Sequence, residues 1–292
     1  MIEIASRVYI ENRYPGPVLG LAVLARGIVL IDAPPCPDAA QTWQHAIRAM
    51  NGGFPDRILV LLDHHPDRTL GASIVNGTIV VHEATAQWFH QHASYFRPTT
   101  EKRGEVWETC PTLQSPQWPR PHVAFTDQLS LYLGDTPVYV HHRPGPAPGA
   151  SWLEIPHLRV LFVGDAVVLK EPPFLAEADL EAWIQALDTM LEQYGHYFIV
   201  SGREGLIEPE QDIPRMRQRL EEWHQQLTAW GREKQPWSKV SKHVEKWLTV
   251  WEPTSERQAQ MFRQRLLYGV GSYYRRRFLT PKRRGRRTKG SG

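Results

Sequence analysis

Acidic and imidazole side chains gather directly after an apolar run at residues 59–62 that has the length of a strand. Asp63, His64, His65 and Asp67 follow within five residues. Such side chains bind divalent metals and transfer protons, and the end of a buried strand holds them rigidly. A polar loop between a strand and a helix would also contain Asp and His. The density of the group favours an active site over that simpler reading.

The elements that must position this group alternate between strands and helices. Apolar runs predict strands over residues 2–10, 18–31, 57–62, 79–81, 129–133, 137–142, 150–155, 159–163 and 197–201, and helices over 39–51, 83–92 and 177–193. This interleaved order, with its hairpins, indicates an α/β or α+β layered fold. Residues 93–121 lose all periodicity, so we interpret them as a long surface excursion near the site.

The last third of the chain is organised differently. From about residue 208 the pattern is helical, over 209–233, 239–250 and 254–275. We therefore expect a site-bearing domain over residues 1–207, a helical extension packed on it over 208–279, and a basic disordered tail over 280–292.

Composition places the chain among globular proteins, with 41% hydrophobic and 22% charged residues. No apolar run reaches the roughly 18 residues that a membrane span needs, and no signal peptide is recognisable at the N-terminus. We therefore expect a cytoplasmic location without membrane contact. Cys36 and Cys110 have no partner at metal-ligand spacing, and a reducing compartment would leave both as thiols.

The C-terminal tail is strongly basic. From Arg275 onward there are nine Lys or Arg residues and no acid, whereas residues 1–274 carry 25 basic and 31 acidic side chains. Tyr273, Tyr274 and Phe278 are interleaved with the bases. This combination suits phosphate contacts and stacking on single-stranded nucleic acid. A solvated terminus or an expression remnant is the alternative interpretation.

Five landmarks in order give the sequence a resemblance to the metallo-β-lactamase superfamily over about residues 5–207. They are Asp32 at the end of the early hairpin, Leu62-Asp63-His64-His65-Pro66-Asp67-Arg68 where the family has T-H-x-H-x-D-H, the Pro-Gly loop at 143–151, Leu161-Phe162-Val163-Gly164-Asp165, and Ser201-Gly202-Arg203-Glu204-Gly205. The resemblance implies a four-layer αββα sandwich with a metal site at one edge of its two sheets, here followed by a helical C-terminal extension.

The resemblance also implies a set of metal ligands, which this chain keeps only in part. Family members typically bind one or two transition metals, often zinc, with four or five His and two Asp. The seven ligand positions correspond, in order, to Asp63, His65, Asp67, Arg68, Pro146, Asp165 and Arg203. Three of the seven keep the family's residue type, and neither Pro146 nor Arg203 can bind a metal.

One metal, held by Asp63, His65 and Asp165, is the first expectation for the site. One imidazole nitrogen with carboxylate oxygens is a harder ligand set than three His, so Mn²⁺ or Fe²⁺ becomes as plausible as Zn²⁺. His142, which precedes the Pro-Gly loop, could swing in to replace the missing loop ligand.

A metal-free network of ion pairs is the second expectation. A second metal would find only two carboxylates, with two arginines beside them, and guanidinium groups neutralise carboxylates directly through bidentate hydrogen bonds. A dinuclear site is therefore not expected. In the network interpretation the polar pocket stays neutral through pairing among Asp63, His65, Asp67, Arg68, Asp165 and Arg203.

Two functions from different classes follow from these two interpretations. In the first, the protein is a metal-dependent hydrolase of a small ester, thioester, lactone or phosphoester. Asp67 orients or deprotonates a metal-bound water, and Arg203 or Arg68 stabilises the oxyanion. In the second, the protein is a non-catalytic relative that acts by binding, through its surface, its helical region and its basic tail. The sequence leaves both open.

Overall fold

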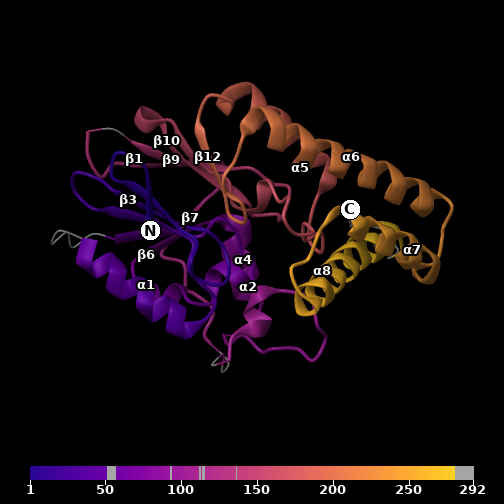
Figure 1. Ribbon diagram of the computed structural model, residues 1–292. Helices are drawn as coiled ribbons and strands as arrows, with labels where there is room; N and C mark the ends of the chain where they lie inside the picture. The colour runs from indigo at the N-terminus through magenta and orange to yellow at the C-terminus, as the bar shows by residue number, and fades with distance from the viewer. Residues whose placement is uncertain (51–56, 93, 112, 114–115, 136, 280–292) are drawn as a thin grey trace, which may run out of the picture.

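Two β-sheets lie face to face at the centre of the computed structural model, and helices cover their outer faces (Figure 1). The structure describes residues 1–50, 57–92, 94–111, 113, 116–135 and 137–279. The expected disordered tail over 280–292 lies outside these residues. Among the described helices, none combines the length and hydropathy that a membrane crossing requires.

The first sheet holds the strands of the N-terminal part of the chain, in sequence order. Its strands are β1 (Ile2–Ala5), β2 (Val8–Glu11), β3 (Leu19–Val23), β4 (Ile28–Ile31), β5 (Arg57–Val60), β6 (Thr78–His82) and β7 (Val123–Phe125). Strands β1 to β4 pair antiparallel, and β4 to β7 pair parallel. Because parallel strands end at the same edge, Asp32 after β4 and Asp63 after β5 come together there.

The second sheet has the order β13-β12-β11-β10-β9-β8. Its strands are β8 (Gln128–Leu131), β9 (Val138–His142), β10 (Ser151–Ile155), β11 (Val160–Phe162), β12 (Phe198–Ser201) and β13 (Gly205–Leu206). Only β11 and β12 pair parallel, so Asp165 and Arg203, which follow them, share an edge. Backbone hydrogen bonds from Ser151 to Leu62 and from Val18 to Gly202, both 2.8 Å, join the two sheets.

Successive side chains at the end of β5 and in the two residues that follow it show why the sheets form inner layers. Leu59 and Leu61 face the helices, whereas Val60 and Leu62 face the second sheet. This alternation follows from the two-residue period of a strand. All four are buried, as expected for a strand covered on both faces.

The outer layers complete the αββα sandwich that the resemblance implied. Helices α1 (Pro37–Met50), α3 (Ala72–Val75) and α4 (Glu83–Gln91) pack on the first sheet, with Trp43 and Phe89 in that interface. Helix α5 (Leu180–Tyr194) packs on the second sheet, and its Trp183 belongs to the same apolar cluster as Trp152 of β10. The expected fold class is confirmed.

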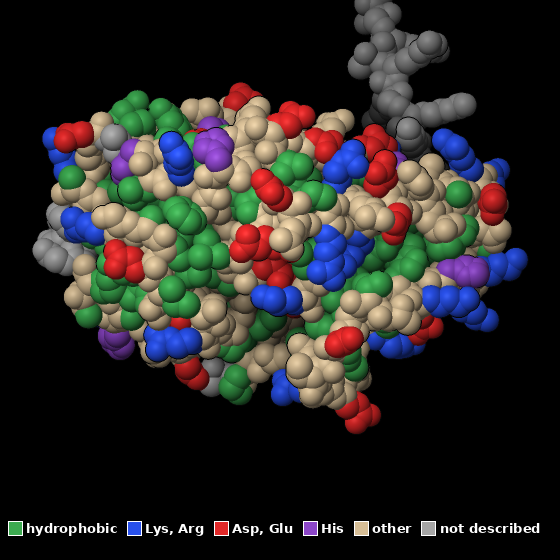
Figure 2. Space-filling model, turned by 45° about the horizontal axis from the view of Figure 1, so that its top comes forward, with side chains coloured by type: hydrophobic (Ala, Val, Ile, Leu, Met, Phe, Trp, Pro, Cys, Tyr) green, Lys and Arg blue, Asp and Glu red, His purple; other side chains and the backbone are tan. Residues whose placement is uncertain are grey.

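The C-terminal helices extend the α5 side of the sandwich. They are α6 (Pro209–Arg232), α7 (Trp237–Val244) and α8 (Glu256–Tyr274), with a 3₁₀ turn over Glu245–Val250 and a π turn over Arg275–Leu279. Met216 and Leu220 of α6 and Leu266 of α8 share one apolar cluster with Leu187 of α5. The proposed domain boundaries stay a prediction. On the face shown in Figure 2, acidic and basic side chains are interspersed.

Local differences from the predicted elements have simple causes. The strand predicted over residues 2–10 is the β1–β2 hairpin, because Arg7 adopts a left-handed backbone conformation with φ 59°. The aperiodic stretch 93–121 contains a 3₁₀ helix over Val106–Thr109. The short strands β7 and β13 have no counterpart among the predicted strands.

Candidate functional site

The turn after β5 is held by its own polar side chains. Asp63 accepts the backbone N–H of His65 at 2.7 Å, and His65 caps the short helix α2 (Pro66–Thr69) by accepting the N–H of Asp67 at 3.4 Å. Thr69 donates its hydroxyl to the carbonyl of His65 at 3.0 Å. Asp67 and Arg68 on this helix are fully buried. The motif is therefore a rigid turn that directs two charged side chains inward.

Arg68 joins carboxylates from both sheets. Its guanidinium group lies 2.6 Å from Asp32, 3.0 Å from Asp63, and in hydrogen-bond contact with Asp165. Asp32 also accepts the N–H of Leu62 at 3.0 Å. A single guanidinium thus forms ion pairs with three buried acids and donates hydrogen bonds to two of them, Asp32 and Asp165.

Arg203 occupies the other side of the same carboxylates. It donates to Asp165 at 3.1 and 3.2 Å and to Asp67 at 3.1 and 3.2 Å. Glu171 lies 3.6 Å from Arg203 and 3.3 Å from Arg265, a buried arginine of α8. We call Asp32, Asp63, Asp67, Arg68, Asp165 and Arg203 the ion-pair floor.

The arginines keep two buried acids of the floor, Asp67 and Asp165, ionised. Burial raises the pKa of Asp165, but Arg203 and Arg68 outweigh it and hold that pKa well below its usual range. For Asp67 burial again acts upward and Arg203 outweighs it, so its pKa is lowered. Burial raises the pKa of Asp32 to about 6, and Arg68 only partly opposes that effect.

His65 and Glu105 form a buried pair beside the floor in which the charged forms are disfavoured. Burial lowers the pKa of His65 to about 4. Burial, followed by the charge of Asp67, raises the pKa of Glu105 to about 7. His65 Nε2 lies 3.8 Å from a Glu105 oxygen and has no hydrogen-bond partner among the described residues. At pH 7 His65 is therefore neutral, and Glu105 is only partly ionised.

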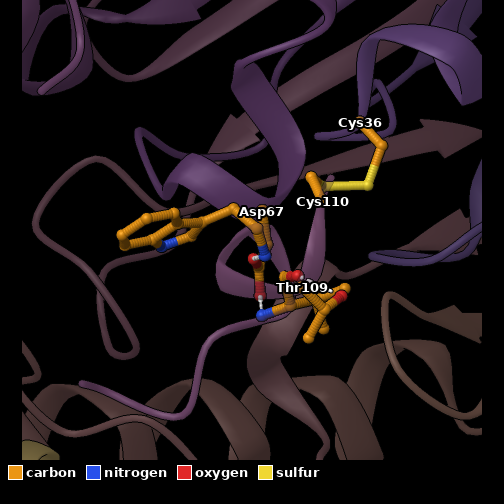
Figure 3. Close-up of a disulfide and its surroundings, with 6 residues drawn as sticks. Cys36, Asp67, Thr109 and Cys110 are labelled. Atoms are coloured by element: carbon orange, nitrogen blue, oxygen red, sulfur yellow. Dashed lines mark hydrogen bonds between the residues drawn. A yellow bond between two sulfur atoms is a disulfide. The ribbon is translucent and has the colours of Figure 1, made fainter. Parts of the chain in front are cut away.

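Segment 94–111 brings Glu105 to the site, and a disulfide joins this segment to the loop after β4. The backbone N–H groups of Val106 and Trp107 donate to Asp67 at 3.2 and 2.8 Å. Just beyond them, Cys110 forms a disulfide with Cys36, which follows β4 (Figure 3). The expectation of two free thiols was wrong. Sequence spacing gave no hint of this pair, because 74 positions separate the two cysteines and only the fold brings them together.

A pocket with a cavity of about 300 Å³ opens above the floor. Asp63, His65, Glu105 and Asp165 line its polar side. Its walls are mainly aromatic. Trp88 comes from α4, Phe96 and Trp107 from segment 94–111, Tyr268 from α8, and Trp118 and Phe174 from loops. Beside the pocket, His64 lies 3.0 Å from Glu177 and stacks on Trp88. Burial acts to raise the pKa of Glu177, but the hydrogen bond from His64 outweighs it and lowers that pKa to about 2.

The structure brings together most residues that the sequence singled out. Those that meet at the pocket and floor are Asp63, His65, Asp67, Arg68, Pro146, Asp165 and Arg203. His142 is engaged elsewhere: it stacks on His82 with ring centroids 3.6 Å apart and bonds the carbonyl of Pro148 at 2.9 Å. His82 caps α4 by accepting the N–H of Ala84.

Sequence reasoning missed three acids of the site. Asp32 was a landmark but was not assigned to the site, although the parallel pairing of β4 and β5 places it there. Glu105 stands in the aperiodic segment and Glu171 in a loop, and neither has a sequence signal. Arg265 did have a sequence signal, because it is a charged residue among the apolar, buried positions of α8.

The donor set does not fit the family's two-metal centre. Asp63, Asp67 and Asp165 each already accept hydrogen bonds or ion pairs from a guanidinium, and Pro146 offers no donor. Within the described residues, one group of three possible ligands lies within 4.8 Å: His65, Asp67 and Glu105. It shares His65 with the expected trio but has Asp67 and Glu105 in place of Asp63 and Asp165.

Comparisons with known proteins agree with this architecture. Residues 64–201 match the family model described as the metallo-beta-lactamase superfamily. No curated protein sequence matches the chain. A metallo-β-lactamase from Pontibacter korlensis is similar at 19% identity and a TM-score of 0.57, over 75% of this chain and 97% of that one. The DIM-1 metallo-β-lactamase exposed to ceftazidime is similar at 15% identity and a TM-score of 0.51, over 75% and 99%.

A larger protein resembles more of the chain. A double mutant of the sec-alkyl sulfatase PisA1 is similar at 12% identity and a TM-score of 0.63 over 94% of this chain, which spans 49% of the sulfatase. At these identities the likeness of the solved structures shows the fold alone. The family match over residues 64–201 and the two-sheet sandwich together identify the fold as that of the metallo-β-lactamase superfamily.

Proposed function

We propose that this protein is a non-hydrolytic member of the superfamily that binds a small molecule in the pocket above the ion-pair floor. One observation carries the proposal: the guanidinium groups of Arg68 and Arg203 lie against the carboxylates that would otherwise bind metals. The aromatic walls above them remain a concave, mainly apolar surface of the kind that binds small ligands.

Electrostatics explain why the arginines and metals exclude each other. A divalent cation at Asp165 would stand within a few ångströms of two guanidinium groups, and like charges at such distances repel strongly in a buried site. Displacing the arginines would leave them buried without partners, which is costly. The floor therefore favours the metal-free state.

A one-metal hydrolase is the second candidate, favoured by the group of His65, Asp67 and Glu105. These residues would hold the ion, which would supply an activated water for hydrolysis of a small ester, thioester, lactone or phosphoester. Asp67 weakens this candidate, because its carboxylate already accepts two backbone N–H groups and two bonds from Arg203.

Metal content tests the two candidates directly. The protein is produced with added Zn²⁺ and Mn²⁺, purified without chelator and analysed for bound metal. We expect far less than one equivalent. A variant with His restored at the four altered positions (Asp63→His, Arg68→His, Pro146→His and Arg203→His) serves as the positive control and should retain metal.

The opposite result would favour the second candidate. One equivalent of metal in the unaltered protein, lost in Glu105→Gln, would overturn the metal-free proposal. So would chelator-sensitive hydrolysis of an ester panel that His65→Ala abolishes. An exposed substitution on the same segment, Glu101→Gln, is the matched control for Glu105→Gln.

A further inference from the structure

We infer that the Cys36–Cys110 disulfide is a redox-sensitive latch that holds one wall of the pocket against the ion-pair floor. The inference concerns regulation and goes beyond the proposed function. It rests on where the disulfide is attached: one cysteine belongs to the rigid loop after β4, and the other ends the 3₁₀ helix that contacts Asp67 (Figure 3).

The latched segment forms a large part of the pocket. Phe96, Arg103, Glu105 and Trp107 of segment 94–111 all line the cavity, and Trp107 packs against Phe96 with ring centroids 4.7 Å apart. Moving this segment would therefore change the shape of the pocket and remove Glu105 from His65.

Apart from the disulfide, two hydrogen bonds join the segment to the floor. The N–H groups of Val106 and Trp107 donate to the single carboxylate of Asp67. On its other side the segment lies tightly against α8, since a Cβ on Gly104 would approach the carbonyl of Met261 to 2.1 Å. The segment thus contacts α8 on one side. On the other side it contacts the α2–β4 region and the apolar cluster of the first sheet that contains Phe96 and Trp107, and the disulfide covalently strengthens only this second side.

Thiol–disulfide exchange with a dithiol reductant can open the latch. Cys110 is partly exposed, whereas Cys36 is 7% exposed, so an incoming thiolate reaches the Cys110 sulfur first. Its attack forms a mixed disulfide and releases Cys36 as a thiolate, which takes up a proton. The second thiol of the reductant then attacks the mixed disulfide. The protein gains two thiols, and the reductant leaves as its own disulfide.

Release of the latch has a local and a global component that must be separated. Removing a cross-link lowers the stability of the whole chain, because the unfolded state gains freedom. A latch does more: it selectively loosens segment 94–111 while the sheets stay folded. The separating observable is the protection of the Val106 and Trp107 amides relative to those of β4.

Hydrogen–deuterium exchange with mass spectrometry measures this difference. The full chain is compared with and without dithiothreitol, using peptides that cover residues 103–111 and the β4 strand Ile28–Ile31. Alkylation with iodoacetamide under the same native conditions confirms that both thiols have formed. We expect exchange at residues 103–111 to accelerate on the order of tenfold or more, with β4 changing much less.

Two controls and two outcomes decide the inference. The double variant Cys36→Ser/Cys110→Ser should show fast exchange at residues 103–111 with or without dithiothreitol. If β4 and residues 103–111 lose protection equally, the disulfide is only a global staple and the latch is wrong. If dithiothreitol reduces the disulfide only under denaturing conditions, the latch is also wrong. Metal content enters neither readout, so this test is independent of that of the proposed function.

Discussion

The ion-pair floor and the His65–Glu105 pair lie side by side and bury acids in opposite ways. In the floor, two arginines from different elements supply enough donors for the carboxylates of Asp67 and Asp165 to stay ionised. In the pair, burial suppresses the charge of both members instead. Burial raises the pKa of the acids in both places. Guanidinium groups outweigh it at Asp67 and Asp165 and oppose it only partly at Asp32, whereas among the described residues no ion pair joins Glu105 to an arginine.

Replacing Arg68 by Met should break the floor and give the largest effect. Asp32, Asp63 and Asp165 would remain buried without their shared cation, so we expect the free energy of unfolding to fall by about 3–5 kcal/mol. Urea unfolding measures this loss of free energy. Arg217→Met is the matched control, because that arginine also pairs with two acids but is 36% exposed. The control substitution should lower the free energy of unfolding by less than about 1 kcal/mol. Equal losses in the two variants would contradict the distinction between buried and exposed pairs.

Much of the fold and the place of the site could be predicted from the sequence. The run Leu59–Leu62 reads as a strand covered on both faces, and the landmarks Asp63, Asp165 and Arg203 each follow a strand. Strand ends are fixed by apolar pattern, and parallel pairing then brings them to one edge. The metallo-β-lactamase resemblance supplied the remaining information, namely how the two sheets stack.

What could not be predicted depends on contacts between distant residues without a pattern of their own. Glu105 lies at the site in a segment that packs against α8 at Gly104 and is joined to the loop after β4 by the Cys36–Cys110 disulfide. Neither spacing nor periodicity encodes such contacts. The partners of Arg68 were a related case. The sequence allowed either a metal site or an ion-pair network around Arg68, and only the positions of Asp32 and Asp165 in the structure favour the network.

Variants of the His65–Glu105 pair should show opposite pH dependences. Between pH 6.5 and about 4 the unfolded state binds a proton at His65 that the folded state does not, so acidification lowers stability. Between pH 4.5 and about 7 the folded state keeps a proton on Glu105 that the unfolded state loses, so a rise in pH lowers stability. The two contributions overlap and oppose each other in the unaltered protein.

Removing one member should therefore expose the contribution of the other. Relative to the unaltered chain, Glu105→Gln should gain stability as the pH rises from 4.5 to 7. His65→Asn, which keeps a cap acceptor for α2, should gain stability as the pH falls from 6.5 to 4. Each change should be on the order of 3 kcal/mol across its window. Urea unfolding at a series of pH values provides the measurement. If the stability of both variants followed the same pH dependence as that of the unaltered chain, the opposing contributions of His65 and Glu105 would be contradicted.

Trp107→Phe tests how much the hydrogen bond from the pocket wall stabilises buried Glu105. The substitution keeps an aromatic ring against Phe96 but removes the indole N–H that Glu105 accepts. A buried acceptor left without its donor costs about 1–3 kcal/mol, so we expect a loss of about 2 kcal/mol in the free energy of unfolding. The double variant Trp107→Phe/Glu105→Leu should recover part of this loss, because both polar partners are then gone. A larger, additive loss would show that packing, and not the hydrogen bond, determines the effect.

Arg203→Lys tests whether the floor needs the guanidinium geometry or only its charge. Lys keeps a positive charge, but its single nitrogen cannot reproduce the set of hydrogen bonds that Arg203 makes to Asp67 and Asp165. We expect a loss of about 1–2 kcal/mol by urea unfolding, corresponding to one or two hydrogen bonds. Arg203→Met, which also removes the charge, should cost clearly more. If Lys and Met cost the same, charge contributes nothing and the floor is stabilised by hydrogen-bond geometry alone. If Lys costs nothing, the floor requires only a cation, and its difference from the His65–Glu105 pair is one of charge.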